Sequence, residues 1–191
     1  MNVANKLTLL RIFMIPAFAV VYLLGVIPFN FAISAGIFAL AAFTDFLDGY
    51  LARKYNMVTN LGKFLDPIAD KVLVSTALIL MLVAPFGNDW AVLQIEGAIA
   101  VAIIIARELI VSGFRIVAAS KGVVLAADKS GKIKTFFQDL AIIVLLAGAD
   151  IMPGVYSVIN IVGVALLGAS TILAIVSGVE YIVKNRALLK E

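Results

Sequence analysis

The sequence contains no cysteine and no histidine among its 191 residues. The absence of cysteine excludes disulfides, thiolate nucleophiles and zinc–thiolate sites. The absence of histidine means that any general base must be a carboxylate, a lysine or a tyrosine, and it excludes phosphohistidine chemistry. Charged residues are also scarce, at 14% of the chain. Acid–base or metal chemistry therefore has to come from a small set of charged side chains.

Hydrophobic residues, in contrast, make up 63% of the chain, and the mean hydropathy is +1.12. Soluble domains average roughly 45–50% apolar residues, and a domain of this size leaves much surface to be covered with polar groups. These values exclude a soluble enzyme, a nucleic-acid-binding domain and a disordered chain. They predict an all-α integral membrane protein.

Long apolar runs separated by charged or turn-forming residues predict six transmembrane helices in a single domain, residues 1–191. No charged residue occurs between Ile12 and Thr44, and Pro28–Asn30 is the natural point of reversal in this run. A short amphipathic helix, with Leu7 and Leu10 beside Lys6 and Arg11, is expected to lie along the membrane surface before the first span. The predicted spans cover roughly residues 12–27, 30–54, 62–83, 92–119, 133–149 and 155–183.

The basic residues are distributed asymmetrically over the predicted loops. The loops near residues 25–31, 85–96 and 149–155 contain no lysine or arginine, so all 15 basic residues lie on the other side or in helix ends that face it. Positive charge is typical of the cytoplasmic side of a membrane protein. We therefore expect a bacterial-type inner (plasma) membrane protein with both termini in the cytoplasm.

Four aspartates lie at the expected cytoplasmic ends of the second and third spans. Asp45 and Asp48 share one face of the second span, and Asp66 and Asp70 share one face of the third. The short link between these spans makes them antiparallel neighbours, so the two acidic faces can converge. Oxygen ligands on rigid helices suit Mg²⁺ or Mn²⁺, and four carboxylates are enough to share two ions.

The same acids have a structural alternative. They can serve as helix caps or as partners of nearby basic residues close to the membrane boundary. The candidate partners are Arg53, Lys54, Lys63 and Lys71. Four acids at helical spacing on adjacent helix ends favour the functional interpretation, because acids at membrane depth are costly.

The string Asp45-Phe-Leu-Asp48-Gly49-Tyr-Leu-Ala52-Arg53, followed at set intervals by Gly62, Asp66 and Asp70, resembles the signature of the CDP-alcohol phosphotransferase family. The resemblance implies a six-span fold and two divalent cations, Mg²⁺ or Mn²⁺. It implies that Asp45 and Asp66 contact both cations, that Asp48 contacts one and that Asp70 contacts the other. It also implies that Asp70 is the base that accepts the proton of the attacking hydroxyl group.

The resemblance further implies a site for the CDP group of the donor, CDP-diacylglycerol. Its residues would be Asn5, Thr8, Asp48, Gly49, Ala52, Arg53 and Thr59. Arginine suits phosphate because it can bind in a bidentate manner. The structural alternatives are a helix cap for Asn5 and Thr8, and a membrane-interface anchor for Arg53.

A second basic set lies later in the chain and suits an acceptor that carries a phosphate group. It consists of Arg107, Arg115, Lys132 and Lys134. Glu108 and Asp139 can instead pair with some of these bases, which would make the set purely structural. Lys121 and Lys129 are expected to be ordinary charges facing the inner leaflet.

The segments 106–115 and 131–135, together with Gln138, resemble the subgroup of the family that forms phosphatidylglycerophosphate. This resemblance implies sn-glycerol 3-phosphate as the acceptor, CMP as the second product and a homodimer in the membrane lipid. An inositol phosphate or another alcohol remains an alternative acceptor. An intramembrane prenyltransferase and a cation-coupled transporter are more distant alternatives, since both also place acids within a membrane.

Overall fold

A computed structural model describes residues 3–54, 60–83, 93–123, 129–150 and 153–186 of the chain. These residues form six helices and no strand. The helices are α1 (Val3–Leu23), α2 (Asn30–Lys54), α3 (Asn60–Val83), α4 (Leu93–Ser120), α5 (Lys129–Gly148) and α6 (Pro153–Lys184). The prediction of an all-α protein is therefore confirmed.

The first helix differs from the prediction at both of its ends. The segment expected to form a separate amphipathic helix is continuous with the first span, so that α1 runs from Val3 to Leu23 with Pro16 in its interior. The helix therefore starts well before residue 12 and ends before residue 27. Backbone hydrogen bonding within an apolar environment favours one unbroken helix over two short ones, because each helix end leaves polar groups unpaired.

The reversal expected at Pro28 is present between α1 and α2. Phe29 has a φ of 57°, which closes the turn before α2 begins. The Asn30 side chain then donates a hydrogen bond to the carbonyl oxygen of Tyr22 over 2.9 Å, and so caps the end of α1. The backbone N–H of Ala32 donates to Asp150 Oδ2 over 2.7 Å, so a residue that follows α5 caps the start of α2.

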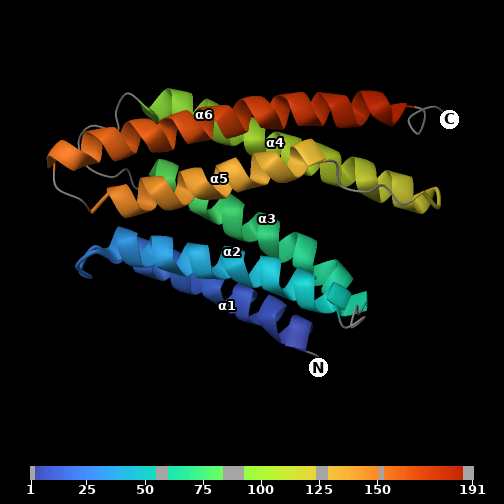
Figure 1. Cartoon of the computed structure of the whole chain (residues 1–191), viewed down its shortest axis with the longest axis horizontal. Helices are drawn as coiled ribbons and strands as arrows, with labels where there is room; N and C mark the ends of the chain where they lie inside the picture. Colours follow the sequence, from blue (N-terminus) through green and yellow to red (C-terminus); the bar gives the residue numbers. More distant parts are fainter. Residues whose placement is uncertain (1–2, 55–59, 84–92, 124–128, 151–152, 187–191) are drawn as a thin grey trace.

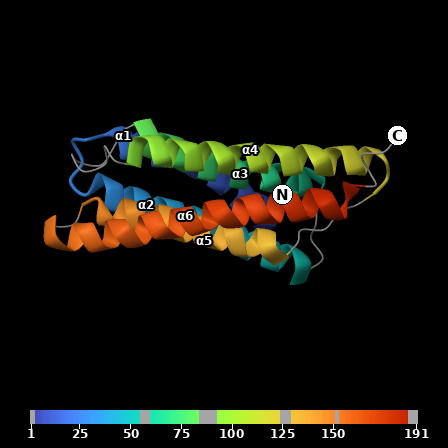
Figure 2. The same cartoon turned by 90° about the horizontal axis from the view of Figure 1, so that it is seen from above.

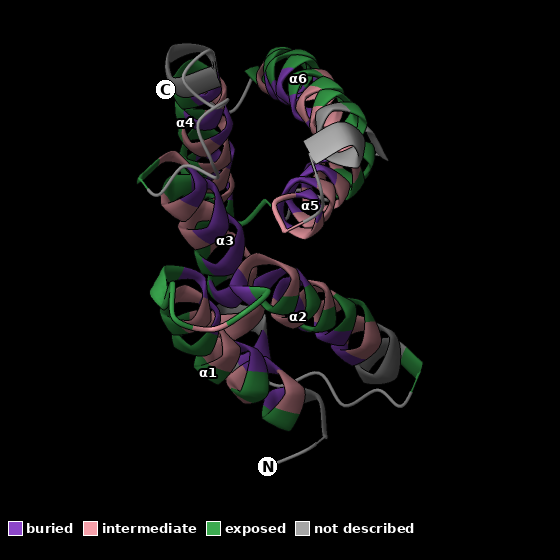
Figure 3. Ribbon diagram, turned by 90° about the vertical axis from the view of Figure 1, so that its left-hand side faces the viewer, coloured by how far each residue is buried: buried purple, intermediate pink, exposed green. Residues whose placement is uncertain are grey.

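The helices form a ring in the order α1, α2, α5, α6, α4, α3 and back to α1. Figure 1 shows α1 and α2 along one side of the bundle and α4 and α6 along the other, with α3 and α5 between them. The end-on view in Figure 3 shows the same order around the bundle. Neighbours in the ring are not always neighbours in sequence, so α2 reaches α5 and α1 reaches α3.

Both chain ends lie at one end of the bundle (Figure 1). The end of α2, the start of α3, the end of α4 and the start of α5 lie at this end as well, as the view from above also shows (Figure 2). Several basic residues accompany them, including Lys54, Lys121, Lys184 and Arg186. The structure therefore gathers the basic helix ends on one side. That this side faces the cytoplasm remains a prediction.

Large apolar side chains cover the outside of the bundle as well as its core. Phe18, Phe38 and Ile142 are fully buried in the main core cluster, whereas Phe13 and Ile116 are each 71% exposed. Four helical stretches are long and apolar enough to cross a membrane: Asn5–Leu23, Asn30–Gly49, Gly97–Ser120 and Val158–Lys184. The exposed side chains are therefore suited to contact with lipid. That α3 and α5 also span the membrane remains a prediction.

Helices α5 and α6 approach each other closely because two glycines lie at their contact. A Cβ atom added to Gly163 would lie 2.4 Å from Leu145 Cδ2, and one added to Gly148 would lie 2.6 Å from Ile159 Cγ2. Small residues of this kind allow the backbones of membrane helices to approach and to gain van der Waals contact.

We predict that Gly163→Ala lowers the free energy of unfolding by about 1–3 kcal/mol, because the added methyl group overpacks the contact with Leu145. Gly168→Ala on the same helix is the matched control, since a Cβ there meets nothing within 4 Å. Thermal unfolding of the purified protein in detergent measures the difference. Equal unfolding temperatures for the two variants would contradict the close approach.

Candidate active site

A buried arginine on α1 bridges the two aspartates of α2. Arg11 Nη1 lies 2.7 Å from Asp45 Oδ1, and Arg11 Nη2 lies 2.5 Å from Asp48 Oδ2. The Arg11 side chain is 0% exposed and that of Asp48 is 4% exposed, whereas that of Asp45 is 44% exposed. Both aspartates face α1, as their spacing of three residues predicts. The guanidinium group neutralises two carboxylates that would otherwise be costly at this depth.

The next polar residue on the same face of α1 binds the third aspartate. Thr8 Oγ1 donates a hydrogen bond to Asp66 Oδ1 over 2.6 Å and is almost completely buried. Thr8 therefore joins α1 to α3 through this hydrogen bond and is not a helix cap. Asn5 lies one turn earlier and is also buried. The face formed by Asn5, Thr8 and Arg11 thus contacts both acidic helices.

The acidic faces of α2 and α3 converge, as the sequence predicts. Asp45 lies close enough to Asp66 and to Asp70 for their charges to interact, and Asp70 also interacts with the charge of Arg11. Gly62, which precedes these acids on α3, is buried. Among the described residues, however, no three acidic side chains meet closely enough to form a ready-made metal site.

The donor chemistry nevertheless fits a divalent cation. The four aspartates offer only oxygen ligands, which Mg²⁺ and Mn²⁺ prefer. Positive charge already lies between Asp45 and Asp48, but it belongs to a guanidinium group whose buried Nε has no hydrogen-bond partner in the described part of the chain. The two aspartates therefore already pair with one cation, the guanidinium group of Arg11, but they leave its Nε without an acceptor. Metal binding by these residues stays a prediction.

Of the alternative partners proposed for these acids, Lys71 interacts with the charge of Asp70, and the side chains of Arg53 and Lys63 lie outside the described residues. Lys54 is exposed at the end of α2, and Lys71 pairs with Glu108 on α4. The partner of Asp45 and Asp48 is Arg11, which sequence reasoning did not assign to them. A signal was available, because Asn5, Thr8 and Arg11 recur every three residues on a helix that is otherwise mostly apolar.

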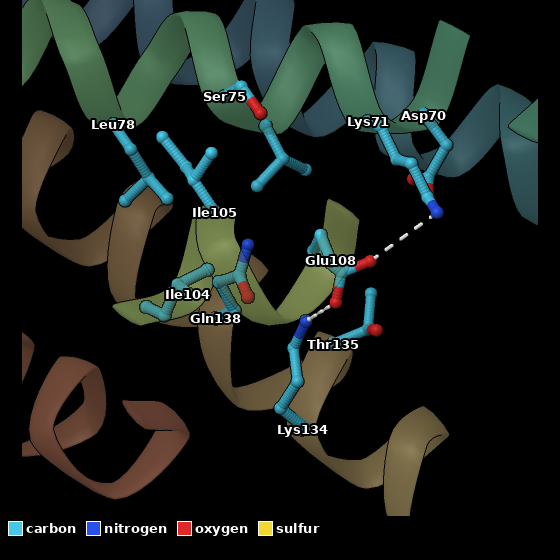
Figure 4. Close-up of a pocket in the computed structure, with 11 residues that line it drawn as sticks. Asp70, Lys71, Ser75, Leu78, Ile104, Ile105, Glu108, Lys134, Thr135 and Gln138 are labelled. Atoms are coloured by element: carbon cyan, nitrogen blue, oxygen red, sulfur yellow. Dashed lines mark hydrogen bonds and ion pairs between the residues drawn. The ribbon is translucent and has the colours of Figure 1, made fainter. Parts of the chain in front are cut away.

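A pocket lies next to the acids, between α3, α4 and α5 (Figure 4). Its polar lining includes Asp70 and Lys71 from α3, Glu108 from α4, and Lys134, Thr135 and Gln138 from α5. Its apolar lining includes Val74, Leu78 and Ile104. The predicted base, Asp70, therefore shares a pocket with two lysines.

Glu108 holds the basic residues of this region together. Its Oε1 lies 2.5 Å from Lys134 Nζ and 2.9 Å from Arg107 Nη1, and its Oε2 lies 3.7 Å from Lys71 Nζ. Lys71 also donates a hydrogen bond to Ser112, one turn further along α4. Three cations surround this carboxylate, and two of them, Lys71 and Lys134, also interact with the charges of Asp70 and Asp139, respectively.

The other two predicted phosphate ligands lie elsewhere. The Arg115 guanidinium group lies over the ring of Tyr181, 5.4 Å from its centroid, and Nε donates to the Tyr181 hydroxyl over 3.2 Å. Lys132 is exposed near the start of α5. The structure thus brings together Arg107 and Lys134, and it adds Lys71, which sequence reasoning did not place in this set.

Part of the predicted nucleotide site lies outside the described residues. Asp48 and Gly49 lie on α2 with Asp48 turned toward α1. The side chains of Ala52 and Arg53, and the whole of Thr59, are not among the described residues. Their roles stay predictions.

Comparison with known proteins decides the family. Residues 1–176 match the family model described as "CDP-alcohol phosphatidyltransferase". The chain belongs to the CDP-alcohol phosphatidyltransferase family. All four aspartates, the Glu108 cluster and the pocket lie within the matched residues.

Curated relatives of this family cover nearly the whole chain. A Bacillus subtilis (strain 168) protein is 40% identical over 99% of this chain and 97% of its own length. A Rickettsia typhi protein is 38% identical over 94% of each chain, and a Salmonella typhimurium (strain LT2) protein is 38% identical over 95% of this chain and 93% of its own. Each is named CDP-diacylglycerol–glycerol-3-phosphate 3-phosphatidyltransferase.

We predict that Arg11→Met lowers the free energy of unfolding by about 3–5 kcal/mol, because it leaves two carboxylates without their buried partner. The exposed Lys6 on the same helix provides the matched control, and Lys6→Met should change the stability by less than about 0.5 kcal/mol. The double variant Arg11→Met with Asp48→Asn should lose less free energy of unfolding than the two single variants lose in sum. Denaturant unfolding in detergent, without added divalent cations, measures the wild-type protein, the three single variants and the double variant. Additive losses would show that Arg11 and Asp48 are not coupled.

Proposed function

We propose that this chain transfers the phosphatidyl group of CDP-diacylglycerol to sn-glycerol 3-phosphate, which gives phosphatidylglycerophosphate and CMP. The observation that carries the proposal is the pocket in which a carboxylate, Asp70, adjoins a cluster of cations. Such a pocket suits an acceptor with a hydroxyl group to be deprotonated and a phosphate group to be held. The names of the relatives, at 37–40% identity over nearly the full chain, support the same reaction.

The proposed step is an in-line displacement at the β-phosphorus atom of the donor. An oxygen–phosphorus bond forms between the acceptor hydroxyl and the β-phosphorus, and the bond to the bridging oxygen of the pyrophosphate breaks as CMP leaves. Asp70 accepts the proton of the attacking hydroxyl group, since no histidine is present. Asp70 lines the pocket and also interacts with the charges of Asp45 and Arg11, which supports its role as the base.

The residues proposed to hold two divalent cations are Asp45, Asp48, Asp66 and Asp70. When bound, such cations neutralise charge on the pyrophosphate and on the departing CMP. The chain itself supplies the alignment: Arg11 and Thr8 fix the carboxylates of α2 and α3 from one face of α1. The cytidine and phosphate groups would lie beside this cluster. They would contact Asn5, Thr8, Asp48, Gly49, Ala52, Arg53 and Thr59.

The acceptor phosphate is proposed to bind the basic set of α4 and α5. The contacts to Glu108 support Arg107 and Lys134 in this role and add Lys71. For Arg115 and Lys132 the proposal rests on the sequence pattern alone. The phosphate group would share the cations with Glu108, which keeps them close together in its absence.

The acyl chains of the donor would remain in the lipid. Phe43 and Phe46, beside Asp45 on α2, are 57% and 68% exposed and offer an apolar route from the bilayer to the aspartates. The excess of basic residues at this end of the bundle supports a site that faces the cytoplasm from the inner membrane. A homodimer is part of the proposal because the family resemblance implies one. Family membership argues against the prenyltransferase and transporter alternatives.

The acceptor is tested by offering purified protein CDP-diacylglycerol with labelled glycerol 3-phosphate, inositol phosphate, serine or phosphatidylglycerol. We expect CMP release and labelled lipid with glycerol 3-phosphate, only in the presence of Mg²⁺ or Mn²⁺, and loss of both when the cation is chelated. Turnover with another acceptor and none with glycerol 3-phosphate would overturn the proposal. Full turnover in chelator would overturn the metal assignment.

We predict that Asp70→Asn lowers kcat by at least about 10³-fold, because the amide cannot accept the proton of the hydroxyl group. Binding of CDP-diacylglycerol, measured by protection against thermal unfolding, should change far less. A variant that turns over normally while remaining cation-dependent would show that Asp70 is not the base.

We predict that Lys134→Gln raises the KM for glycerol 3-phosphate by about 10- to 100-fold, because a charge-assisted contact to phosphate is lost. Lys121→Gln is the control, since Lys121 is exposed beyond α4 and does not line the pocket. Initial rates at saturating CDP-diacylglycerol measure both variants. Equal KM values would place the acceptor phosphate outside the Glu108 cluster.

A further inference from the structure

A buried amide on α5 has a polar atom without a partner. Gln138 is 1% exposed and is among the largest fully buried side chains of the bundle. No donor among the described residues reaches its Oε1. A buried acceptor that stays unpaired destabilises the folded protein, so its presence calls for a compensating role.

The position of Gln138 indicates that role. Its side chain lines the pocket that also contains Asp70, Lys71 and Lys134, and Figure 4 shows it extending from α5 into this space. Asp139, the next residue, also has a buried oxygen without a partner, but Asp139 is not part of the pocket lining. Of the two residues with an unpaired oxygen, Gln138 is therefore the one whose side chain lines the pocket.

The groups around the pocket define the chemistry of its ligand. Lys71 and Lys134 suit a phosphate group, Asp70 suits a hydroxyl group that loses its proton, and an amide oxygen needs a donor. A molecule that satisfies all three is a small phosphorylated polyol with a second hydroxyl group. The rest of the lining consists of Glu108, the hydroxyl-bearing Ser75 and Thr135, and apolar side chains that include Leu78 and Ile104.

We propose that Gln138 is a specificity-determining residue whose amide oxygen accepts a hydrogen bond from the non-reacting hydroxyl group of the acceptor. The proposal rests on the function proposed above and adds a subsite for the central hydroxyl of glycerol 3-phosphate. A site built to pair with a hydroxyl group rejects an analogue that lacks it, because the buried acceptor then stays unpaired. The unpaired oxygen therefore lowers the stability of the folded protein without acceptor, and it favours an acceptor that carries this hydroxyl group.

The test compares two acceptors, sn-glycerol 3-phosphate and the phosphate ester of 1,3-propanediol, which lacks only the central hydroxyl group. For the wild-type protein we expect kcat/KM to be about 10- to 100-fold higher with glycerol 3-phosphate. In Gln138→Met, which keeps the length of the side chain, this ratio should fall to within about 3-fold, mainly through a higher KM for glycerol 3-phosphate. A wild-type ratio near unity would overturn the proposal without any variant being made.

A structural role for Gln138 would give a different pattern. Loss of folding or of pocket shape lowers kcat/KM for both acceptors equally, and this result with Gln138→Met would overturn the proposal. Ile104→Val, which changes the apolar lining by one methyl group, is the control and should leave the ratio as in the wild-type protein. Failure of the proposed function can be told apart from failure of the Gln138 proposal. If the proposed function is wrong, the wild-type protein uses neither of the two acceptors.

Stability provides a readout that does not depend on turnover. Without substrates, Gln138→Met should unfold at the same temperature as the wild-type protein or higher, because an unpaired buried oxygen has been removed. Added glycerol 3-phosphate, without CDP-diacylglycerol, should raise the unfolding temperature of the wild-type protein more than that of the variant. An equal rise for the wild-type protein and the variant would overturn the proposal.

Discussion

The pairing of Arg11 with Asp45 and Asp48 is the constraint on which the acidic end of the bundle depends. Charges within an apolar bundle have to be neutralised by a partner at the same depth. This requirement fixes α1 beside α2 at the height of the aspartates. Thr8, on the same face of α1, then binds Asp66 and sets the position of α3. One polar face of a mostly apolar helix therefore positions both helices that carry the acids.

In a second cluster the charges are reversed, because a carboxylate lies among cations. Around Glu108, the cations of Arg107, Lys134 and Lys71 come from three different helices. Asp70 lies between the two clusters and interacts with the charges of both Arg11 and Glu108. Such a division suits a reaction between two anionic substrates, because each anion has its own region and only the reacting groups need to meet.

The limits of the helices followed from sequence because a bilayer demands long apolar runs with charges at their ends. The exception is α1, which differs from the prediction at both ends and most of all at its start. There, Leu7 and Leu10 beside Lys6 indicated a surface helix, whereas the bundle buries Thr8 and Arg11. Local amphipathicity does not reveal which polar residues a neighbouring helix covers.

The site was predictable to the extent that it depends on spacing within one helix. Intervals of three and four residues placed the aspartates on shared faces, and their helices converge as expected. Contacts between distant helices were not predictable in this way. The pairing of Arg11 with Asp48 and the stacking of Arg115 on Tyr181 depend on which helices are neighbours in the ring. The partnerless oxygen of Gln138 required coordinates, because a sequence cannot show that a donor is missing.

The hydrogen bond from the Ala32 backbone to Asp150 lies at the end of the bundle far from the aspartates. It joins the start of α2 to the end of α5, and these helices carry Asp48 and Lys134, respectively, near their opposite ends. The cap therefore ties α2 to the segment after α5 at the end of the bundle opposite the aspartates, almost the full length of a helix away from them.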